Sequence, residues 1–435
     1  MELKTTLWSD LSETERSVLL QRPHLDNEAA VDTRVSDIIA EVRRNGDQAV
    51  QQFSREFDGA DLHDLTVDAD EMTWAANELS TAQHAAIELA VDNVSKFHKA
   101  QLTEPISVET MPGVLCERIS QPINPVGLYV PAGSAPLPST AIMLCVPAAI
   151  AGCETRIICT PPRSDGRADP AVVVAAMCAG TERIFKIGGA QAIAAMAYGT
   201  ATVPRVNKVF GPGNTWVTAA KKRVAMTPGG PAIDMPAGPS EVLVIADDAA
   251  NASFVASDLL SQAEHGEDSQ VILLTNCKTL ANNVIAALGR QLGQIGRQAI
   301  ARAALANCRI VVTADLKTAV RISNSYAPEH LIVQTQNPRE QLTAIRNAGS
   351  IFLGPWSPES AGDYCSGTNH VLPTYGHAAS YSGLSVDQFM RQTTVQELSK
   401  DGLASIATAI DELALMEGLD AHANAVRIRF ANTEI

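Results

Sequence analysis

The pattern of hydrophobic and polar positions changes character along the 435-residue chain. In the first hundred or so residues, apolar side chains recur at helical spacing, for example through residues 31–57 and 71–99. After about residue 121, short apolar runs alternate with helical stretches, which is typical of parallel α/β units. Beyond about residue 385 the pattern becomes helical again.

The alternating region consists of two blocks, separated by a loop rich in Pro, Gly and Ala at residues 227–239. Runs such as Glu241–Ala246 and Gln270–Thr275 predict strands, each followed by a helical stretch. The expected fold class is α/β, with two successive Rossmann-like parallel domains and helical N-terminal and C-terminal additions. The predicted organisation is a helical N-terminal region at 1–125 that contributes to the first α/β domain, the domains 126–238 and 239–384, and a helical C-terminal segment at 385–435.

Composition excludes several classes of protein. Hydrophobic residues make up 46% and charged residues 19% of the chain, which describes a globular protein rather than a disordered or fibrous one. The net charge of −15 argues against nucleic acid as a partner. No apolar run is long enough to cross a membrane and no signal-peptide pattern opens the chain, so we expect a cytoplasmic protein. The eight cysteines include no Cys-x-x-Cys pair, which favours reduced thiols over a disulfide framework.

Two glycine-containing turns are candidates for ligand binding, although the dinucleotide fingerprint Gly-x-Gly-x-x-Gly is absent. They are Gly188-Gly189-Ala190-Gln191, after a predicted strand, and Gly211-Pro212-Gly213-Asn214. Both allow a ligand to approach the backbone closely, and the amides of Gln191 and Asn214 add donors and acceptors. Structural turns would explain the same residues, so the pattern alone leaves NAD binding open.

Gln262 and His265 lie three residues apart at the end of a predicted helix, followed by Gly266 as a natural C-cap. The negative end of the helix dipole favours a bound cation there. Taken alone the pair is a weak signal, because a capping or solvent-facing histidine gives the same pattern and glutamine is a rare zinc ligand.

Further polar residues are weak candidates one by one. Glu329 and His330 lie at a predicted helix-to-strand junction, where an acid and an imidazole could act as two different proton acceptors. Asp363 follows a predicted strand in a loop of small residues, which would place it at the carboxyl edge of the sheet. Glu417 and His422 belong to the helical tail. Because these residues are far apart in sequence, only the fold can assemble them.

Many ordered motifs together resemble the histidinol dehydrogenase family, over about residues 30–425. One position departs from the expected pattern, since Ala132-Gly133 stands where a Gly-Gly pair is expected; a positive φ at Ala132 would cost about 1 kcal/mol. The motifs are Val126-Gly127-Leu128-Tyr129-Val130-Pro131, Lys186-Ile187-Gly188-Gly189-Ala190-Gln191-Ala192, Gly211-Pro212-Gly213-Asn214, Asp234-Met235-Pro236-Ala237-Gly238-Pro239-Ser240-Glu241, Gln262-Ala263-Glu264-His265, Ala327-Pro328-Glu329-His330-Leu331, the stretch 354–363, Gly367-Thr368-Asn369-His370-Val371-Leu372-Pro373-Thr374 and His422.

The resemblance implies a zinc-dependent enzyme that oxidises L-histidinol through the aldehyde to L-histidine with two NAD, at the end of histidine biosynthesis. It also implies one zinc per subunit and a homodimer, with NAD contacted by residues 126–238, zinc and catalytic residues in 239–384, and exchange between subunits through 385–435. By motif position, the resemblance implies that the zinc ligands are Gln262, His265, Asp363 and His422 and that the catalytic pair is Glu329 and His330. The implied NAD contacts are Tyr129, Gln191 and Asn214. The implied substrate contacts are Ser240, Gln262, His265, His330, Asp363, Glu417 and His422.

Three alternatives stay open at this point. A zinc hydrolase would also need a metal and a neighbouring glutamate, and NAD dependence separates it from a dehydrogenase. A non-catalytic paralogue would be expected to lack Glu329, His330 or a ligand, and this chain keeps them all. A relative could oxidise another amino alcohol or a sulfonate, although Glu417 and His422 favour an amine and an imidazole. A general-base His330 with an ordinary pKa of about 6.5 predicts activity that rises through neutral pH.

Overall fold

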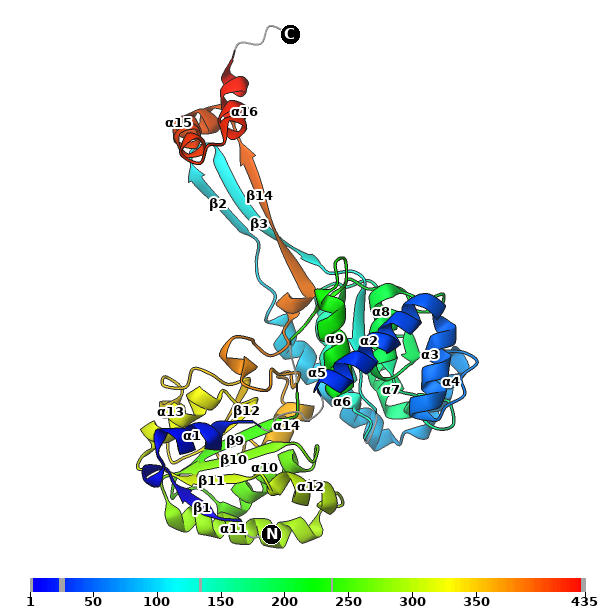
Figure 1. The fold of residues 1–435 in the computed structure, drawn as a ribbon, viewed down its shortest axis with the longest axis vertical. Helices are drawn as coiled ribbons and strands as arrows, with labels where there is room; N and C mark the ends of the chain where they lie inside the picture. The colour runs from blue at the N-terminus through cyan, green and yellow to red at the C-terminus, as the bar shows by residue number, and fades with distance from the viewer. Residues whose placement is uncertain (1–2, 23–27, 133–134, 236–237, 432–435) are drawn as a thin grey trace. The chain divides into compact units, whose positions relative to one another are not determined.

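A computed structural model describes residues 3–22, 28–132, 135–235 and 238–431 (Figure 1). Motif residues Gly133, Pro236 and Ala237 lie outside the described residues. The chain forms two compact units, the first made of residues 1–101 and 123–389 and the second of residues 102–122 and 390–435. Two parallel sheets in the first unit confirm the predicted α/β class.

The first sheet has six parallel strands in the order β1-β11-β10-β9-β12-β13. Its elements are β1 (Thr5–Leu7), β9 (Glu241–Ala246), β10 (Gln270–Thr275), β11 (Arg309–Val312), β12 (His330–Gln334), β13 (Ser350–Leu353), α1 (Glu13–Leu20), α10 (Ala252–Ala263), α11 (Lys278–Gln291), α12 (Gln298–Leu305), α13 (Leu316–Tyr326) and α14 (Glu359–Tyr364). Helices α10, α11 and α12 pack on one face, and α1 and α13 pack on the other. Coverage of both faces explains why the central strands are continuous apolar runs.

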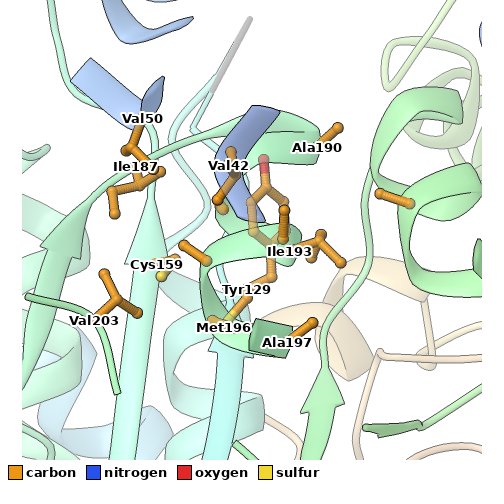
Figure 2. Packing of buried hydrophobic residues seen from close by; sticks show 14 of the residues in the cluster. Val42, Val50, Tyr129, Cys159, Ile187, Ala190, Ile193, Met196, Ala197 and Val203 are labelled. Carbon is orange, nitrogen blue, oxygen red and sulfur yellow. The ribbon is translucent and has the colours of Figure 1, made fainter. Parts of the chain in front are cut away.

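The second sheet has five parallel strands in the order β6-β5-β4-β7-β8. Its elements are β4 (Val126–Tyr129), β5 (Arg156–Thr160), β6 (Ile184–Lys186), β7 (Lys208–Phe210), β8 (Ala232–Ile233), α2 (Glu28–Asn45), α3 (Asp47–Phe53), α4 (Ala69–Glu78), α5 (Thr81–Lys99), α6 (Pro138–Ile150), α7 (Pro170–Cys178), α8 (Gly189–Tyr198) and α9 (Thr215–Met226). Helices α2, α3, α8 and α9 form a core with one face of this sheet. Figure 2 shows the Tyr129 ring within that core, among Val42, Ile193 and Met196.

The second unit contains an antiparallel sheet in the order β14-β3-β2 and two helices. Its elements are β2 (Ile106–Met111), β3 (Val114–Pro122), β14 (Met390–Leu398), α15 (Lys400–Met416) and α16 (Asp420–Phe430). The β2–β3 turn contains Gly113 at φ +77°, and a Cβ on Gly402 would lie 2.0 Å from the Gly113 carbonyl oxygen. The first turn of α15 therefore packs directly on this hairpin.

The structure differs from the sequence expectation at both ends. Residues 1–125 are expected to be helical and to join the first α/β domain, but β1 pairs with β11 in the other sheet, and β2 and β3 form a hairpin. The segment 385–435 is expected to be helical, but it contains β14. These strands escape the pattern because β1 has three residues and β2 and β14 are mostly exposed, so no buried face marks them.

Within the described ranges, no helix has the length and apolarity needed to cross a bilayer. All eight cysteines are free thiols, as the sequence predicts.

Candidate active site

The candidate site lies where the central strands of the six-stranded sheet begin. Glu329 immediately precedes β12, and His330 is the first residue of that strand. Glu241 is the first residue of the neighbouring strand β9, which pairs with β12 in parallel. Both members of the expected catalytic pair therefore lie beside the backbone of Glu241.

Two helices carry further candidates to this same edge. In a parallel sheet the connecting helices run antiparallel to the strands, so the end of α10 returns Gln262 and His265 to the amino ends of the strands. The expected position of Asp363 in a loop at the carboxyl edge is wrong. Asp363 lies on α14, and its Oδ1 is 3.7 Å from His330 Nε2.

His330 is held in one tautomer. Its Nδ1 lies 3.1 Å from the carbonyl oxygen of Glu241, and because a carbonyl can only accept, Nδ1 carries the proton. Nε2 is then left as an acceptor, and this buried atom has no hydrogen-bond partner among the described residues. Burial lowers the pKa of His330 to about 3, against the opposing effect of the Glu241 carbonyl. A pKa lowered in this way would keep His330 neutral at neutral pH, so a rise of activity in that range would report another group.

Glu329 is buried and bound by the same residue. Its Oε2 accepts a hydrogen bond of 2.8 Å from the N–H of Glu241 and lies 3.7 Å from His330 Nδ1. Burial raises the pKa of Glu329 well above its ordinary value, and the charges of Glu241 and Asp363 act in the same direction. A carboxylate in this environment holds a proton more strongly than one in water, which suits a proton acceptor.

Three side chains form a cluster that could hold a metal ion. Ligand atoms of His265, Glu359 and Asp363 all lie within 4.8 Å of one another. With its amide nitrogen turned toward Glu359, Gln262 donates to Oε1 at 2.9 Å, which leaves the amide oxygen for a cation. Imidazole and carboxylate are common ligands of zinc, and an amide oxygen is a rarer one. The donor set therefore fits a metal.

Glu359 is the member of this cluster that the sequence analysis does not single out. Glu359 and Asp363 are four residues apart on α14 and so share one helix face. In a sequence, this spacing would point to a pair of carboxylates on one side of a helix. The small residues between Glu359 and Asp363 instead predict a loop, in which the spacing has no such meaning.

The remaining two candidates belong to the second unit. Glu417 directly follows α15, and His422 lies in the first turn of α16. Both side chains are exposed. Of the expected ligands, Gln262, His265 and Asp363 therefore lie together in the first unit. His422 and Glu417 belong to the second unit, which is described by itself.

The expected cofactor contacts follow strands of the five-stranded sheet. Tyr129 ends β4, and its hydroxyl accepts a hydrogen bond of 3.0 Å from the N–H of Gly189. Gln191 lies in the first turn of α8, after β6. Asn214, after β7, caps α9 by accepting from the N–H of Val217 at 3.1 Å, which leaves its amide donors available.

A cavity of about 610 Å³ is lined by Tyr129, Gln191, Asn214 and His265. The expected NAD contacts therefore share this cavity with His265 of the candidate metal site. Gln191 is 1% exposed, and within the part of the chain that the structure describes neither its amide oxygen nor its nitrogen has a hydrogen-bond partner. A buried amide without partners calls for an explanation, and a polar ligand in this cavity provides one. A second cavity of about 500 Å³ is lined by Ser240, Asn214 and His265.

Comparison with known proteins supports the motif resemblance. The model of the histidinol dehydrogenase family matches residues 20–430. The chain belongs to the histidinol dehydrogenase family. Histidinol dehydrogenase of Vibrio cholerae serotype O1 is 53% identical over 427 residues, 98% of each chain, and that of Escherichia coli K12 is 51% identical over 422 residues, 97% of this chain and 96% of the other. A crystal structure of histidinol dehydrogenase from Elizabethkingia anophelis, 44% identical, superposes with a TM-score of 0.94 over 98% of this chain and 97% of that one.

The departure from the expected histidinol dehydrogenase pattern at Ala132 carries no backbone strain. Among the described residues, the non-glycine positions with positive φ are Ala327 and Tyr375. Ala132 is not one of these positions, and it lines the larger cavity.

Asp58 is a further residue that lines the larger cavity. It ends a short π-helical turn, Ser54–Asp58, and its Oδ2 is buried with no hydrogen-bond partner in the described ranges. Burial raises the pKa of Asp58 from 3.8 to about 6. The folded state therefore binds this proton more strongly than the unfolded state, so its contribution to stability falls as pH rises from about 4 to about 6.

Asp58→Asn should accordingly increase the free energy of unfolding at pH 7.5 by about 1 kcal/mol, allowing for solvent screening. This gain should shrink as the pH is lowered through 6 toward 4, as measured by urea unfolding at a series of pH values. Asp61→Asn, at an exposed carboxylate three residues along the chain, is the control and should show no such trend. A gain that is independent of pH would contradict the assignment to Asp58.

Proposed function

We propose that the chain is a zinc-dependent histidinol dehydrogenase, which oxidises L-histidinol through L-histidinaldehyde to L-histidine with two NAD, the last step of histidine biosynthesis. The observation that carries this proposal is the position of the Glu329–His330 pair. Both side chains are buried and held by the backbone of one residue, Glu241, and His330 Nε2 lies 3.7 Å from Asp363 of the candidate metal site. A substrate bound at the cluster would meet both proton acceptors.

Binding of the metal is assigned to Gln262, His265, Asp363 and His422, and contacts to NAD are assigned to Tyr129, Gln191 and Asn214. Zinc, when bound, would supply positive charge that orients the imidazole and amine of the substrate. NAD, when bound, would accept hydride in each of the two oxidations.

The two proton acceptors, His330 and Glu329, would act one after the other. In the first oxidation, Nε2 of His330 accepts the proton of the alcohol, while Nδ1 stays bound to the Glu241 carbonyl. Glu329 then takes a proton from the water that hydrates the aldehyde, before the second oxidation. The Glu241 N–H keeps the Glu329 carboxylate beside His330 throughout.

Ser240, Glu417 and His422 complete the proposed substrate contacts, together with the metal ligands and His330. We further propose a cytoplasmic homodimer with one zinc per subunit, in which residues 385–435 serve the neighbouring subunit's site. The exposure of Glu417 and His422 in their own unit supports this assignment, because neither is used in its core.

The test is the yield of NADH from limiting L-histidinol with excess NAD, together with elemental analysis of the purified protein. Two NADH per histidinol and one zinc per chain would support the proposal, and removal of zinc by a chelator with add-back would show whether turnover needs it. One NADH would indicate a simple alcohol dehydrogenase. No NADH would favour a relative that acts on another amino alcohol, to be found by screening such compounds.

Glu329→Gln should separate the two oxidations. Glutamine can still accept the hydrogen bond from the Glu241 N–H, but it cannot take a proton from water. We expect the rate with L-histidinaldehyde to fall at least about tenfold more than the rate of the first oxidation, measured as single-turnover NADH formation. An equal loss in both steps would contradict the division of work between Glu329 and His330.

A further inference from the structure

We propose that Arg22 is a positioning residue for the Glu329–His330 pair. Its ion pair with Glu241 fixes this residue at the start of β9, and the backbone N–H and C=O of Glu241 hold the two catalytic side chains. This inference rests on the proposed roles of Glu329 and His330, and it concerns a residue far from them in sequence.

The ion pair is bidentate and shielded from water. Arg22 Nη2 donates to Glu241 Oε2 at 2.8 Å, and Arg22 Nε donates to Oε1. The Glu241 side chain is completely buried and that of Arg22 is 14% exposed. Shielding strengthens such a pair, and the planar guanidinium fixes its direction as well as its distance.

Arg22 also binds the turn that leads to the catalytic pair. Its Nη2 donates to the carbonyl oxygen of Tyr326 at 2.8 Å, and its guanidinium lies 3.9 Å from the centre of the Tyr326 ring. Tyr326 ends α13, and the chain reaches Glu329 three residues later. Arg22 therefore contacts the start of strand β9, through Glu241, and the segment that leads into strand β12, through Tyr326.

Backbone strain is concentrated in this same network. Ala327, at φ +52°, follows Tyr326, and Tyr375, at φ +56°, donates its N–H to Glu241 Oε1 at 3.0 Å. Among the residues that the structure describes, these two are the non-glycine positions with positive φ. Such conformations persist where surrounding contacts impose them, and they gather at functional sites. Both residues contact the Arg22–Glu241 pair, Ala327 through its carbonyl oxygen, 3.4 Å from Arg22 Nη2, and Tyr375 through its N–H.

The backbone of Glu241 converts this rigidity into catalytic geometry. Its N–H, in the peptide with Ser240, orients Glu329 at 2.8 Å, and its C=O, in the peptide with Val242, orients His330 at 3.1 Å and fixes the imidazole tautomer. If the Glu241 residue shifts, the two peptide groups that flank its Cα shift with it, and both acceptors are displaced. A displacement of about 1 Å at reacting groups can cost about a hundredfold in rate.

The test compares Arg22→Gln and Arg22→Lys with the wild-type holoenzyme. Glutamine removes the charge, whereas lysine keeps it but cannot bridge both carboxylate oxygens and the Tyr326 carbonyl. We expect kcat to fall about tenfold to a hundredfold in Arg22→Gln and less in Arg22→Lys. KM values and zinc content should stay within about twofold of wild type, because Arg22 is not assigned to substrate, cofactor or metal.

Arg16→Gln is the matched control for loosening of the N-terminal segment. Arg16 lies on α1 and donates to the carbonyl oxygen of Trp8, so it fastens the same segment without touching Glu241. Its kcat should equal that of the wild type. An equal loss of kcat in Arg16→Gln, or unchanged kcat in both Arg22 variants, would overturn the proposal.

A second readout does not require turnover of histidinol. In ¹⁵N-histidine NMR spectra, assigned with His330→Asn, wild-type His330 should show the Nδ1–H tautomer alone, and Arg22→Gln should show a mixture. A single unchanged tautomer in Arg22→Gln would overturn the inference even where the enzyme proves to act on another substrate. Failure of the proposed function would instead appear as absence of NADH with wild-type protein.

Discussion

His330→Asn should lower kcat by about 10²–10⁴-fold, the range expected for loss of a general base. Asparagine has an amide nitrogen that can donate to the Glu241 carbonyl, as Nδ1 does at 3.1 Å. It has no counterpart to Nε2, the buried atom that faces Asp363 at 3.7 Å. The substitution therefore removes proton acceptance while keeping the hydrogen bond to β9. Steady-state NADH formation measures the loss.

Two controls accompany this variant. His63→Asn, at an exposed position outside the site, should leave kcat unchanged. The zinc content of His330→Asn should equal that of the wild type, because His330 is not among the proposed ligands. A kcat within about threefold of wild type would show that another group accepts the proton.

Gly211→Ala should cost at least about 3 kcal/mol of stability and weaken the proposed binding of NAD. Gly211 has φ +119°, a conformation that residues with a Cβ rarely adopt, and a Cβ there would lie 2.1 Å from the carbonyl oxygen of Tyr129. Its N–H also donates to the buried Asp234 carboxylate at 2.8 Å, and its carbonyl oxygen accepts from Lys221 at 2.7 Å. The backbone cannot move away without breaking these bonds.

Gly229→Ala separates strain from collision in this experiment. Gly229 also has a positive φ, +74°, but nothing lies within 4 Å of the position of its Cβ. We expect a loss of about 1 kcal/mol there, with no effect on KM for NAD. Urea unfolding and KM for NAD are the measurements. Equal losses at the two glycines would mean that the contact with Tyr129 is relieved by a small shift.

The parts of the fold that could be predicted are those buried on both faces. Strands such as β9 and β10 are continuous apolar runs, and the sequence places their bounds as the structure does. The missed strands depend on partners far along the chain: Thr5 pairs with Ile310, and Met390 with Pro122. No local pattern records such a pairing, because a short or exposed strand is stabilised by its neighbours in the sheet rather than by its own periodicity.

The candidate site shows the same limit at the level of single residues. Motifs were enough to select Gln262, His265 and Asp363, which the structure brings together, although the edge of the sheet predicted for Asp363 was wrong. Glu359 and Arg22 were not selected, because their importance depends on what folds against them. The catalytic and binding roles themselves stay predictions until the variants are measured.

The pairing of β1 with β11 also has a consequence for synthesis on the ribosome. Residues of β1 and Arg22 leave the ribosome early, but their partners in β11, Tyr326 and the turn at Tyr375 are made much later. The sheet of the second unit is likewise incomplete until β14 has been synthesised and can pair with β3. Sheets closed by such distant segments form slowly and leave strand edges exposed in the meantime. We therefore expect the nascent chain to need chaperone protection until synthesis is nearly complete.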